Sequence, residues 1–109
     1  MRKGKEAAQI GLLKSRAKQL IRGAAENTDR IGWSDHALKR MRQRRVSPSQ
    51  VLKVLRQGKM IGNPSLDKNT GHWKCKLERY TAGDCLNVIV AIERNEDNTP
   101  IIIVSAIVD

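Results

Sequence analysis

The sequence predicts an α+β fold in which N-terminal helices pack on one face of a small antiparallel sheet. Up to Gly58 the apolar residues recur at helical spacing, and beyond it they alternate, which is typical of strands. The chain has 109 residues, enough for a single hydrophobic core. We therefore expect one compact unit, in which residues 1–30 form a helical extension and residues 31–109 form the α+β domain.

Residues 5–26 predict an amphipathic helix that ends at the turn formers Asn27-Thr28-Asp29. Its apolar stripe recurs at three- and four-residue spacing and consists of Ile10, Leu13, Ala17, Leu20 and Ala24. The stripe has two interpretations. It packs on the rest of the domain, which is the more common outcome, or it forms the seam of a homodimer.

Two short helices follow, each with a capping signal of its own. Ser34 is the expected N-cap of a helix over residues 35–45, and its buried edge is expected to consist of Ala37, Leu38 and Met41. Ser47 and Gln50 form a capping box for a third helix, which Gly58 is expected to end. The core positions expected in this helix are Val51, Leu52 and Leu55.

Beyond Gly58 we expect four strands and one polar loop. The strands are predicted over residues 59–62, 72–80, 85–93 and 100–108, and the loop over residues 63–71. The last strand is apolar on both faces, which is typical of a strand buried on both sides. It is therefore the expected central strand.

The tight turn after Tyr80 fixes the register of a hairpin if Tyr80 pairs with Cys85. One face of the hairpin is then apolar and consists of Trp73, Cys75, Leu77, Leu86, Val88, Val90 and Ile92. The opposite face is polar and carries His72, Lys74, Lys76, Glu78, Tyr80 and Asn87. This register places the two cysteines on opposite faces, so no disulfide is expected between them.

Positive charge is concentrated in the first half of the chain. The whole sequence has 21 Lys and Arg against 11 Asp and Glu, a formal net charge of +10. Residues 31–59 hold 8 basic side chains against Asp35 alone, whereas residues 60–109 hold 5 basic and 7 acidic ones. A polyanion such as RNA is the natural partner of this field. An acidic protein would also satisfy it, and excess charge can serve solubility alone.

Several classes of protein are excluded. The longest apolar run, residues 101–104, is far too short to span a membrane. Met1-Arg2-Lys3 precedes a mixed polar segment that is not typical of a signal peptide, so we expect a cytoplasmic protein. Two cysteines cannot form a disulfide scaffold or a four-cysteine zinc site, and no cofactor or metal is expected.

His36, Arg40 and Arg44 stand four residues apart and form a stripe on the predicted second helix. Cleavage of RNA at the 2′-OH requires a base, an acid and cations that stabilise the charged phosphorane. Histidine exchanges protons near neutral pH, and arginine offers bidentate donors to phosphate. The alternative interpretation is the solvated face of an ordinary amphipathic helix.

His72, Lys74, Lys76 and Tyr80 form a second candidate group, because alternation directs them to one face of a strand. Lysine can hold phosphate charge, and tyrosine can stack on a base. The alternative interpretation is the solvent face of an antiparallel sheet. No glycine-rich phosphate loop, dinucleotide fingerprint or pair of catalytic carboxylates occurs.

The segment Ser34-Asp35-His36-Ala37-Leu38-Lys39-Arg40-Met41-Arg42-Gln43-Arg44-Arg45-Val46-Ser47 resembles a bacterial family still labelled as of unknown function. Its mark is a helix H-A-L-x-R-M-x-x-R, then a hydrophobic residue and Ser, a second helix and a β-meander. That family resembles the RelE and HigB toxin ribonucleases of the barnase–EndoU–colicin–RelE fold group. The resemblance covers about residues 33–108. At the turn after the motif, Arg45 stands where a glycine is usual.

The resemblance implies a small ribonuclease toxin with a partner antitoxin, and His36, Arg40 and Arg44 fall on its motif. We therefore expect a metal-independent endoribonuclease of a toxin–antitoxin or prophage-type system, with His36 as general acid/base and the two arginines on the scissile phosphate. The residues expected to contact RNA are Arg42, Arg45, His72, Lys74, Lys76 and Tyr80. The rival hypotheses are a non-catalytic nucleic-acid-binding module and a protein-interaction domain that dimerises through its first helix.

Overall fold

Three helices and a short strand precede a run of four long strands in the part of the chain that the computed structural model describes, residues 13–81 and 83–108. The elements are α2 (Lys14–Glu26), η1 (Thr28–Arg30), β1 (Ile31–Trp33), α3 (Asp35–Arg44), α4 (Pro48–Gln57), β2 (Lys59–Asp67), β3 (His72–Thr81), β4 (Asp84–Arg94) and β5 (Pro100–Val108). This order confirms the predicted α+β class. None of the described helices is long and apolar enough to cross a membrane.

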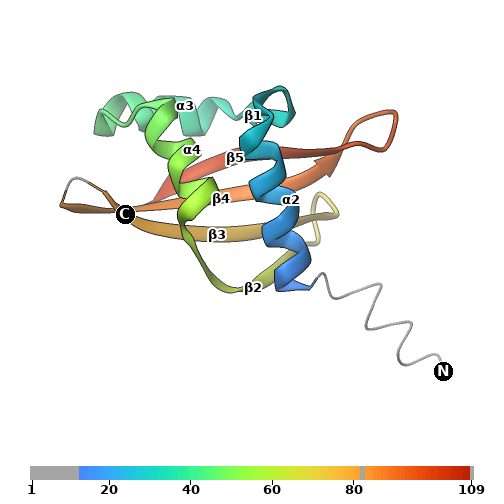
Figure 1. Ribbon diagram of the computed structural model, residues 1–109. Coiled ribbons are helices and arrows are strands. Elements are labelled where there is room, and N and C mark those ends of the chain that lie inside the picture. The colour runs from blue at the N-terminus through green and yellow to red at the C-terminus, as the bar shows by residue number, and fades with distance from the viewer. Residues whose placement is uncertain (1–12, 82, 109) are drawn as a thin grey trace.

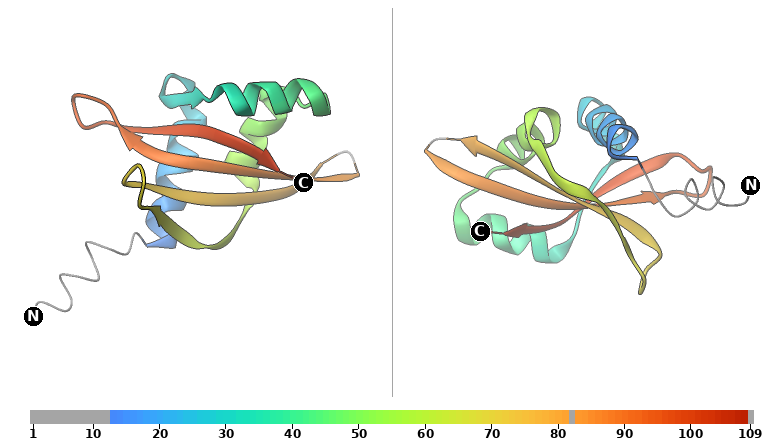
Figure 2. Two further views of the ribbon diagram at one scale, coloured as in Figure 1. Left: turned by 180° about the vertical axis from the view of Figure 1, so that it is seen from behind. Right: turned by 90° about the horizontal axis from the view of Figure 1, so that it is seen from below.

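Helices α2 and α4 lie side by side across one face of the sheet, and α3 lies along the β5 edge (Figures 1 and 2). The hydrophobic core fills the space between the sheet and the two helices that cover it. Its largest fully buried side chains are Ile21, Leu55, Met60, Ile102, Ile107, Val51, Val54, Val88, Val90 and Val104. Aliphatic residues therefore form this core, as expected for a chain with 3% aromatic residues.

Helix α2 begins later than predicted. Leu13 has an extended backbone with φ −66° and ψ 139°, and its side chain is 70% exposed. The prediction of a continuous helix over residues 5–26 is therefore wrong at Leu13. Residues 5–12, including Ile10, lie outside the described residues. The buried positions are Ala17, Ile21, Ala24 and Ala25, while Leu20 is half-buried. The three alanines among them allow α2 to pack closely against α4 and the sheet within the chain.

The capping predictions for α3 and α4 are confirmed. The Ser34 hydroxyl accepts a hydrogen bond of 3.0 Å from the backbone N–H of Ala37, and Ser47 forms the complete capping box with Gln50. One core prediction is wrong, because Leu38 is 36% exposed and lines a surface cavity at the corner between α3 and α4. Leu52 is half-buried and packs against the core. In α4 the fully buried positions are Val51, Val54 and Leu55.

Gly58 ends α4, as predicted, because no larger residue fits there. A Cβ atom at this position would lie 2.4 Å from the carbonyl oxygen of Val54 and 3.1 Å from that of Glu78. Its φ of −73° is not left-handed, so the constraint is the close approach of two backbones rather than conformational freedom. This contact brings the end of α4 directly onto the hairpin.

The sheet is mixed rather than antiparallel, with strand order β1-β5-β4-β3-β2. Strand β1 pairs parallel to β5, with Ile31 opposite Ile102, and the other pairs are antiparallel. Two parallel strands need a long connection in sequence. Here the connection from β1 to β5 contains β2, β3 and β4 as well as α3 and α4. The predicted central position of the last strand is also wrong, because β4 is the middle strand and β5 lies between β4 and β1.

Strand β2 is longer than predicted and absorbs most of the expected polar loop. It continues to Asp67 through a break in register between Ile61 and Ser65. Gly62 has a left-handed φ of 70° in this bulge, and Pro64 removes one backbone donor. A proline is tolerated there because β2 is an edge strand. Because the residues of the bulge are typical of a turn, the sequence predicts a loop where the strand continues.

The predicted hairpin register is confirmed, with Tyr80 paired to Cys85 in β3 and β4. The inner face is apolar as predicted, and its members are buried except for the half-buried Trp73. Both cysteines are free, Cys75 on the inner face and Cys85 on the outer one. The outer face of β3 carries His72, Lys74, Lys76, Glu78 and Tyr80, and we call it the polar sheet face.

The turn between α3 and α4 yields a prediction for stability. Arg45 has left-handed φ and ψ of 57° and 43°, a conformation that disfavours residues with a Cβ atom. We expect Arg45→Gly to raise the free energy of unfolding by about 0.5–1 kcal/mol in urea titrations. The control Arg42→Gly, inside α3, should lower it by about 1 kcal/mol. A loss of stability in both variants would contradict the strain at Arg45.

Candidate nucleic-acid interface

The predicted stripe on α3 starts at a well-anchored end of the helix. The Ser34 hydroxyl donates a hydrogen bond of 2.9 Å to the carbonyl oxygen of Ser105, which ties the start of α3 to β5. His36, two residues after this anchor, is exposed, and Arg40 is half-buried with Nη1 3.5 Å from Oε1 of Gln43. The stripe exists, but its imidazole projects from the surface.

Arg44 attaches the other end of α3 to the sheet. Its Nη2 lies 3.1 Å from Oδ2 of Asp84, and Nη1 donates to the carbonyl oxygen of Val108 at 3.5 Å. The side chain is only 18% exposed. Asp84 therefore neutralises part of the charge that sequence reasoning assigned to a scissile phosphate.

Arg42 and Arg45 lie on another side of α3. They line a cavity of about 410 Å³ at the corner between α3 and α4. The other lining residues are Leu38, Met41, Val46, Ser47 and Pro48. Both arginines are exposed, and most of the other lining residues are apolar. The two guanidinium groups thus flank an apolar recess.

The polar sheet face brings together the second group of candidates. Lys74 Nζ lies 2.9 Å from Oδ2 of Asp67 on β2, and this hydrogen bond holds the pKa of Asp67 below its ordinary value. Lys74 and Lys76 also line a cavity of about 240 Å³ with Ser65 and Ile61 of β2. Tyr80 is 74% exposed at the far end of the strand. One lysine of the row is paired with an acid, and Lys76 is exposed.

His72 is the candidate with the most developed surroundings. Its Nδ1 lies 3.5 Å from Oε2 of Glu93 on β4. Both residues line a cavity of about 460 Å³ that also contacts Leu20, Gly71, Trp73, Ile92 and Arg94. We call it the His72 cavity. It is within the usual size range of small-ligand sites. A carboxylate beside Nδ1 orients an imidazole and leaves Nε2 for proton transfer.

None of the three cavities described above is lined by His36, Arg40 or Arg44. The structure therefore brings His72, Lys74 and Lys76 to cavities and leaves Tyr80 and the α3 stripe outside these three. Among the described residues, no three His, Cys, Asp or Glu side chains form a group that could hold a metal ion. Proton transfer and charge pairing are the chemistry that these side chains themselves offer.

Sequence reasoning missed Glu93 and Arg94 at the His72 cavity. A signal was present, because extending the Tyr80–Cys85 register to the start of β3 places His72 beside Glu93. Arg94 follows Glu93 and donates a hydrogen bond of 2.9 Å to the carbonyl oxygen of Asn98. This bond ties Arg94 to the turn between β4 and β5. Asp67 was missed because residues 63–71 were expected to form a loop, whereas Asp67 ends strand β2.

The outer end of the hairpin contains a polar group of a different kind. Burial, together with the nearby carboxylates of Glu78 and Asp84, raises the pKa of the Cys85 thiol. Asn87 is 6% exposed, and its Nδ2 lies 3.9 Å from Cys85 Sγ. Its Oδ1 has no hydrogen-bond partner among the described residues. Cys85 is thus held as a neutral thiol rather than as a reactive thiolate.

These observations define a small, strongly basic α+β protein with a polar sheet face. The chain belongs to the family described as a domain of unknown function (DUF4258), whose model matches residues 33–108. No curated protein and no solved structure matches the chain significantly. The matched segment contains α3, α4 and the four long strands, so every candidate residue named above from sequence falls within it. Helix α2 precedes it.

The buried Cys75 thiol yields a prediction on pH dependence. Burial raises its pKa to about 11 from an ordinary value of 9.0. Since the unfolded chain releases this proton first, the stability of the folded state is complete below pH 9 and falls as the pH approaches 11. We expect the free energy of unfolding to fall by about 2–3 kcal/mol across this range. Urea titrations at several pH values measure it.

Cys75→Ala should remove this contribution, whereas Cys85→Ala should keep it. Tyrosine and lysine titrations contribute equally to Cys75→Ala and to the wild type, so the difference between these two proteins isolates Cys75. Identical pH profiles for Cys75→Ala and the wild type would contradict the assignment.

Proposed function

We propose that the protein is a metal-independent endoribonuclease related to the RelE and HigB toxins, acting in the cytoplasm as part of a toxin–antitoxin or prophage-type system. The observation that carries the proposal is the pairing of His72 with Glu93 at a cavity on a strongly basic protein. Its RNA substrate follows from the net charge of +10. A RelE-like arrangement of the fold is part of the same proposal.

The reaction needs one proton acceptor and one proton donor. The imidazole of His72 takes the proton of the 2′-OH, and the 2′-oxygen attacks the phosphorus to form a 2′,3′-cyclic phosphate. The bond between phosphorus and the 5′-oxygen breaks, and the departing 5′-oxygen takes a proton from water. Glu93 stabilises the imidazolium that forms, at a distance of 3.5 Å. Arg94, which lines the same cavity, supplies positive charge for the phosphorane, and Trp73 offers an aromatic surface to a base.

His36, Arg40 and Arg44 remain a second arrangement for the same reaction, favoured by the resemblance of their motif. Two observations favour His72 over His36 as the acid/base. His72 has a carboxylate neighbour and lies at a cavity, whereas His36 is exposed on α3. Arg44, paired with Asp84, then acts as an anchor of α3 rather than as a phosphate ligand.

The cavity flanked by Arg42 and Arg45 supports a protein partner. An acidic segment with one apolar side chain, such as part of a cognate antitoxin or another inhibitor, would place its carboxylates on the two arginines and the apolar group in the recess. The non-catalytic RNA-binding module remains the rival, because the same cations serve both functions. Only a cleavage assay separates the two.

The test is cleavage of labelled RNA in the presence of EDTA. We expect the wild type to cleave, and we expect His72→Gln to lower the rate by about 100- to 10,000-fold, since it removes the proton acceptor. Glu93→Gln should cause a smaller loss because the imidazole remains. Affinity for RNA, measured separately, should change little in both variants.

His36→Gln is the matched control and should cleave at nearly the wild-type rate. If His36→Gln abolishes cleavage and His72→Gln does not, the site lies on α3 and the assignment of His72 is wrong. RNA binding by the wild type without any cleavage would identify a binding module instead.

A further inference from the structure

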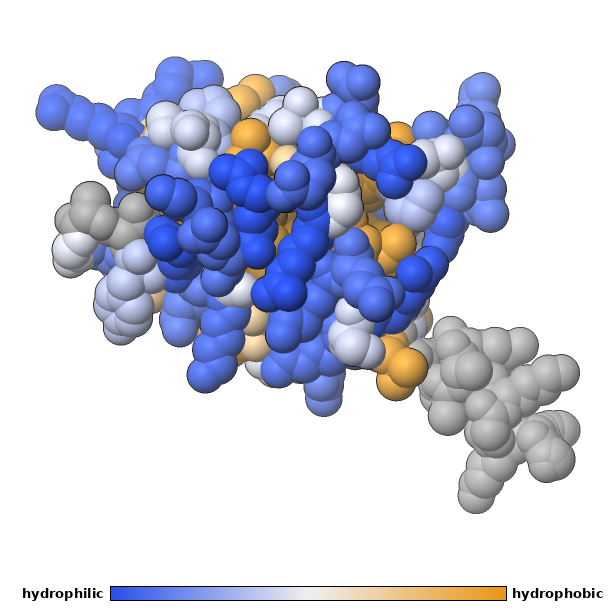
Figure 3. Space-filling model, viewed as in Figure 1, coloured by the Kyte–Doolittle hydropathy of each residue, from blue (hydrophilic) through white to orange (hydrophobic). Residues whose placement is uncertain are grey.

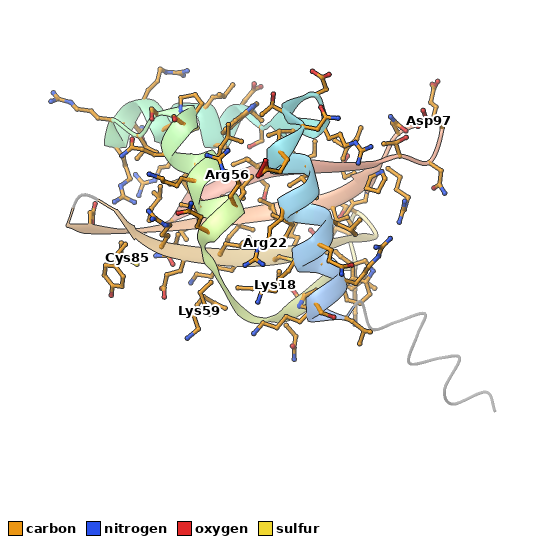
Figure 4. All side chains as sticks on the ribbon, viewed as in Figure 1. Lys18, Arg22, Arg56, Lys59, Cys85 and Asp97 are labelled. Atoms are coloured by element: carbon orange, nitrogen blue, oxygen red, sulfur yellow. The ribbon has the colours of Figure 1, made fainter. Side chains whose placement is uncertain are left out.

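Three cations of the helical layer lie outside the site described so far. Lys18 and Arg22 stand one turn apart on α2, and Arg56 stands near the end of the neighbouring helix α4. We call them the helix-face cluster. In Figure 4 their labelled side chains lie between the two helices, with Lys59 at the start of β2 below them. One surface therefore collects positive charge from two helices.

No acid within the described residues forms an ion pair with the helix-face cluster. Elsewhere in the molecule, acids of the sheet form ion pairs, among them Asp84 with Arg44, Glu93 with His72 and Asp67 with Lys74. Neighbouring like charges repel each other, and no ion pair within residues 13–81 and 83–108 offsets this repulsion at the cluster. An anionic ligand would offset it.

The surface around the cluster is suited to phosphates more than to a protein. Protein interfaces have an apolar centre, but the three residues of the cluster are all cations, and of the exposed large hydrophobic residues only Leu13 adjoins either of its two helices, at the start of α2. Figure 3 shows this face as predominantly hydrophilic. Phosphate contacts need only flexible cations, and they supply most of the affinity of non-specific binding.

The cluster and the His72 cavity lie on opposite sides of α2. Leu20 of α2 lines that cavity, whereas Lys18 and Arg22, each two residues from Leu20, project from the other side of the helix. A helix with its side chains is about 10–12 Å across. A single strand that leaves the cavity over α2 therefore reaches the cluster after a short stretch.

We propose that the helix-face cluster binds the phosphates of single-stranded RNA that flank the nucleotide in the His72 cavity. The proposal deepens the proposed function and rests on it for the position of that nucleotide. Binding by the cluster itself is independent of cleavage. Its consequence is that long strands bind more tightly than short ones, because only long strands reach from the cavity to the cluster.

The probes are 2′-O-methyl oligouridylates of about 4 and about 12 nucleotides, a range typical of single-strand binding sites. Without a free 2′-OH they cannot be cleaved by the proposed route, so fluorescence anisotropy reports binding alone. The variant is Arg22→Gln/Arg56→Gln. The charge-matched control is Arg30→Gln/Lys39→Gln, on η1 and α3. Thermal melts followed by circular dichroism check that both variants fold.

We expect the cluster variant to bind the long strand roughly tenfold more weakly, with a salt dependence reduced by about 1.4 in logarithmic slope, since each single-strand phosphate contact contributes about 0.7. The short strand should bind both variants and the wild type alike. The control should lose much less affinity for the long strand.

Equal losses in the two variants would overturn the proposal, because net charge alone would then explain binding. Equal effects on short and long strands would overturn it as well. A third outcome would also overturn it. If poly-glutamate of matched charge competes with the long strand, and binds the cluster variant more weakly than the wild type, the cluster is a site for an acidic protein partner. If the cluster behaves as expected and wild type cleaves no RNA, the proposed function fails and this inference stands.

Discussion

The register of the β3–β4 hairpin is the constraint on which the core and the candidate site both depend. Because Tyr80 pairs with Cys85, alternate residues of β3 divide into an apolar inner set and a polar outer set. A shift by one residue would turn Lys74 and Lys76 inward and expose Leu77. Unpaired buried charges cost several kcal/mol each, so only the observed register is compatible with a folded core.

The same register determines how charge is distributed. Acids of the C-terminal half meet cations across the sheet, as Asp67 does with Lys74 and Glu93 with His72. These contacts fix side chains in position, which suits a group that must exchange a proton at a defined place. The helix-face cluster has no such acids among the described residues. The molecule therefore combines a polar sheet face of paired charges with a helical face of unpaired ones.

Local signals predicted much of the fold. The N-cap of α3, the capping box of α4, the helix stop at Gly58 and the hairpin register each depend on residues close together in sequence. The wrong predictions concern strands that pair with a segment distant in sequence, or strands in which the alternation of apolar and polar residues is interrupted. The parallel pairing of β1 with β5 joins residues about seventy positions apart, and nothing in Ile31-Gly32-Trp33 specifies its direction. The bulge at Gly62 and Pro64 interrupts the alternation of β2 and resembles a loop.

The candidate site shows the same division between local and distant signals. A stripe such as His36, Arg40 and Arg44 is visible in the sequence because a helix places residues four apart on one side. Whether those side chains converge with others is a tertiary property, and here Arg44 turns to Asp84 while His36 stays exposed. His72 acquires its carboxylate from a neighbouring strand, and that strand, β4, is held on both sides by β3 and β5. An acid/base pair on two adjacent strands is held by two paired backbones, whereas a stripe on a helix is held by one.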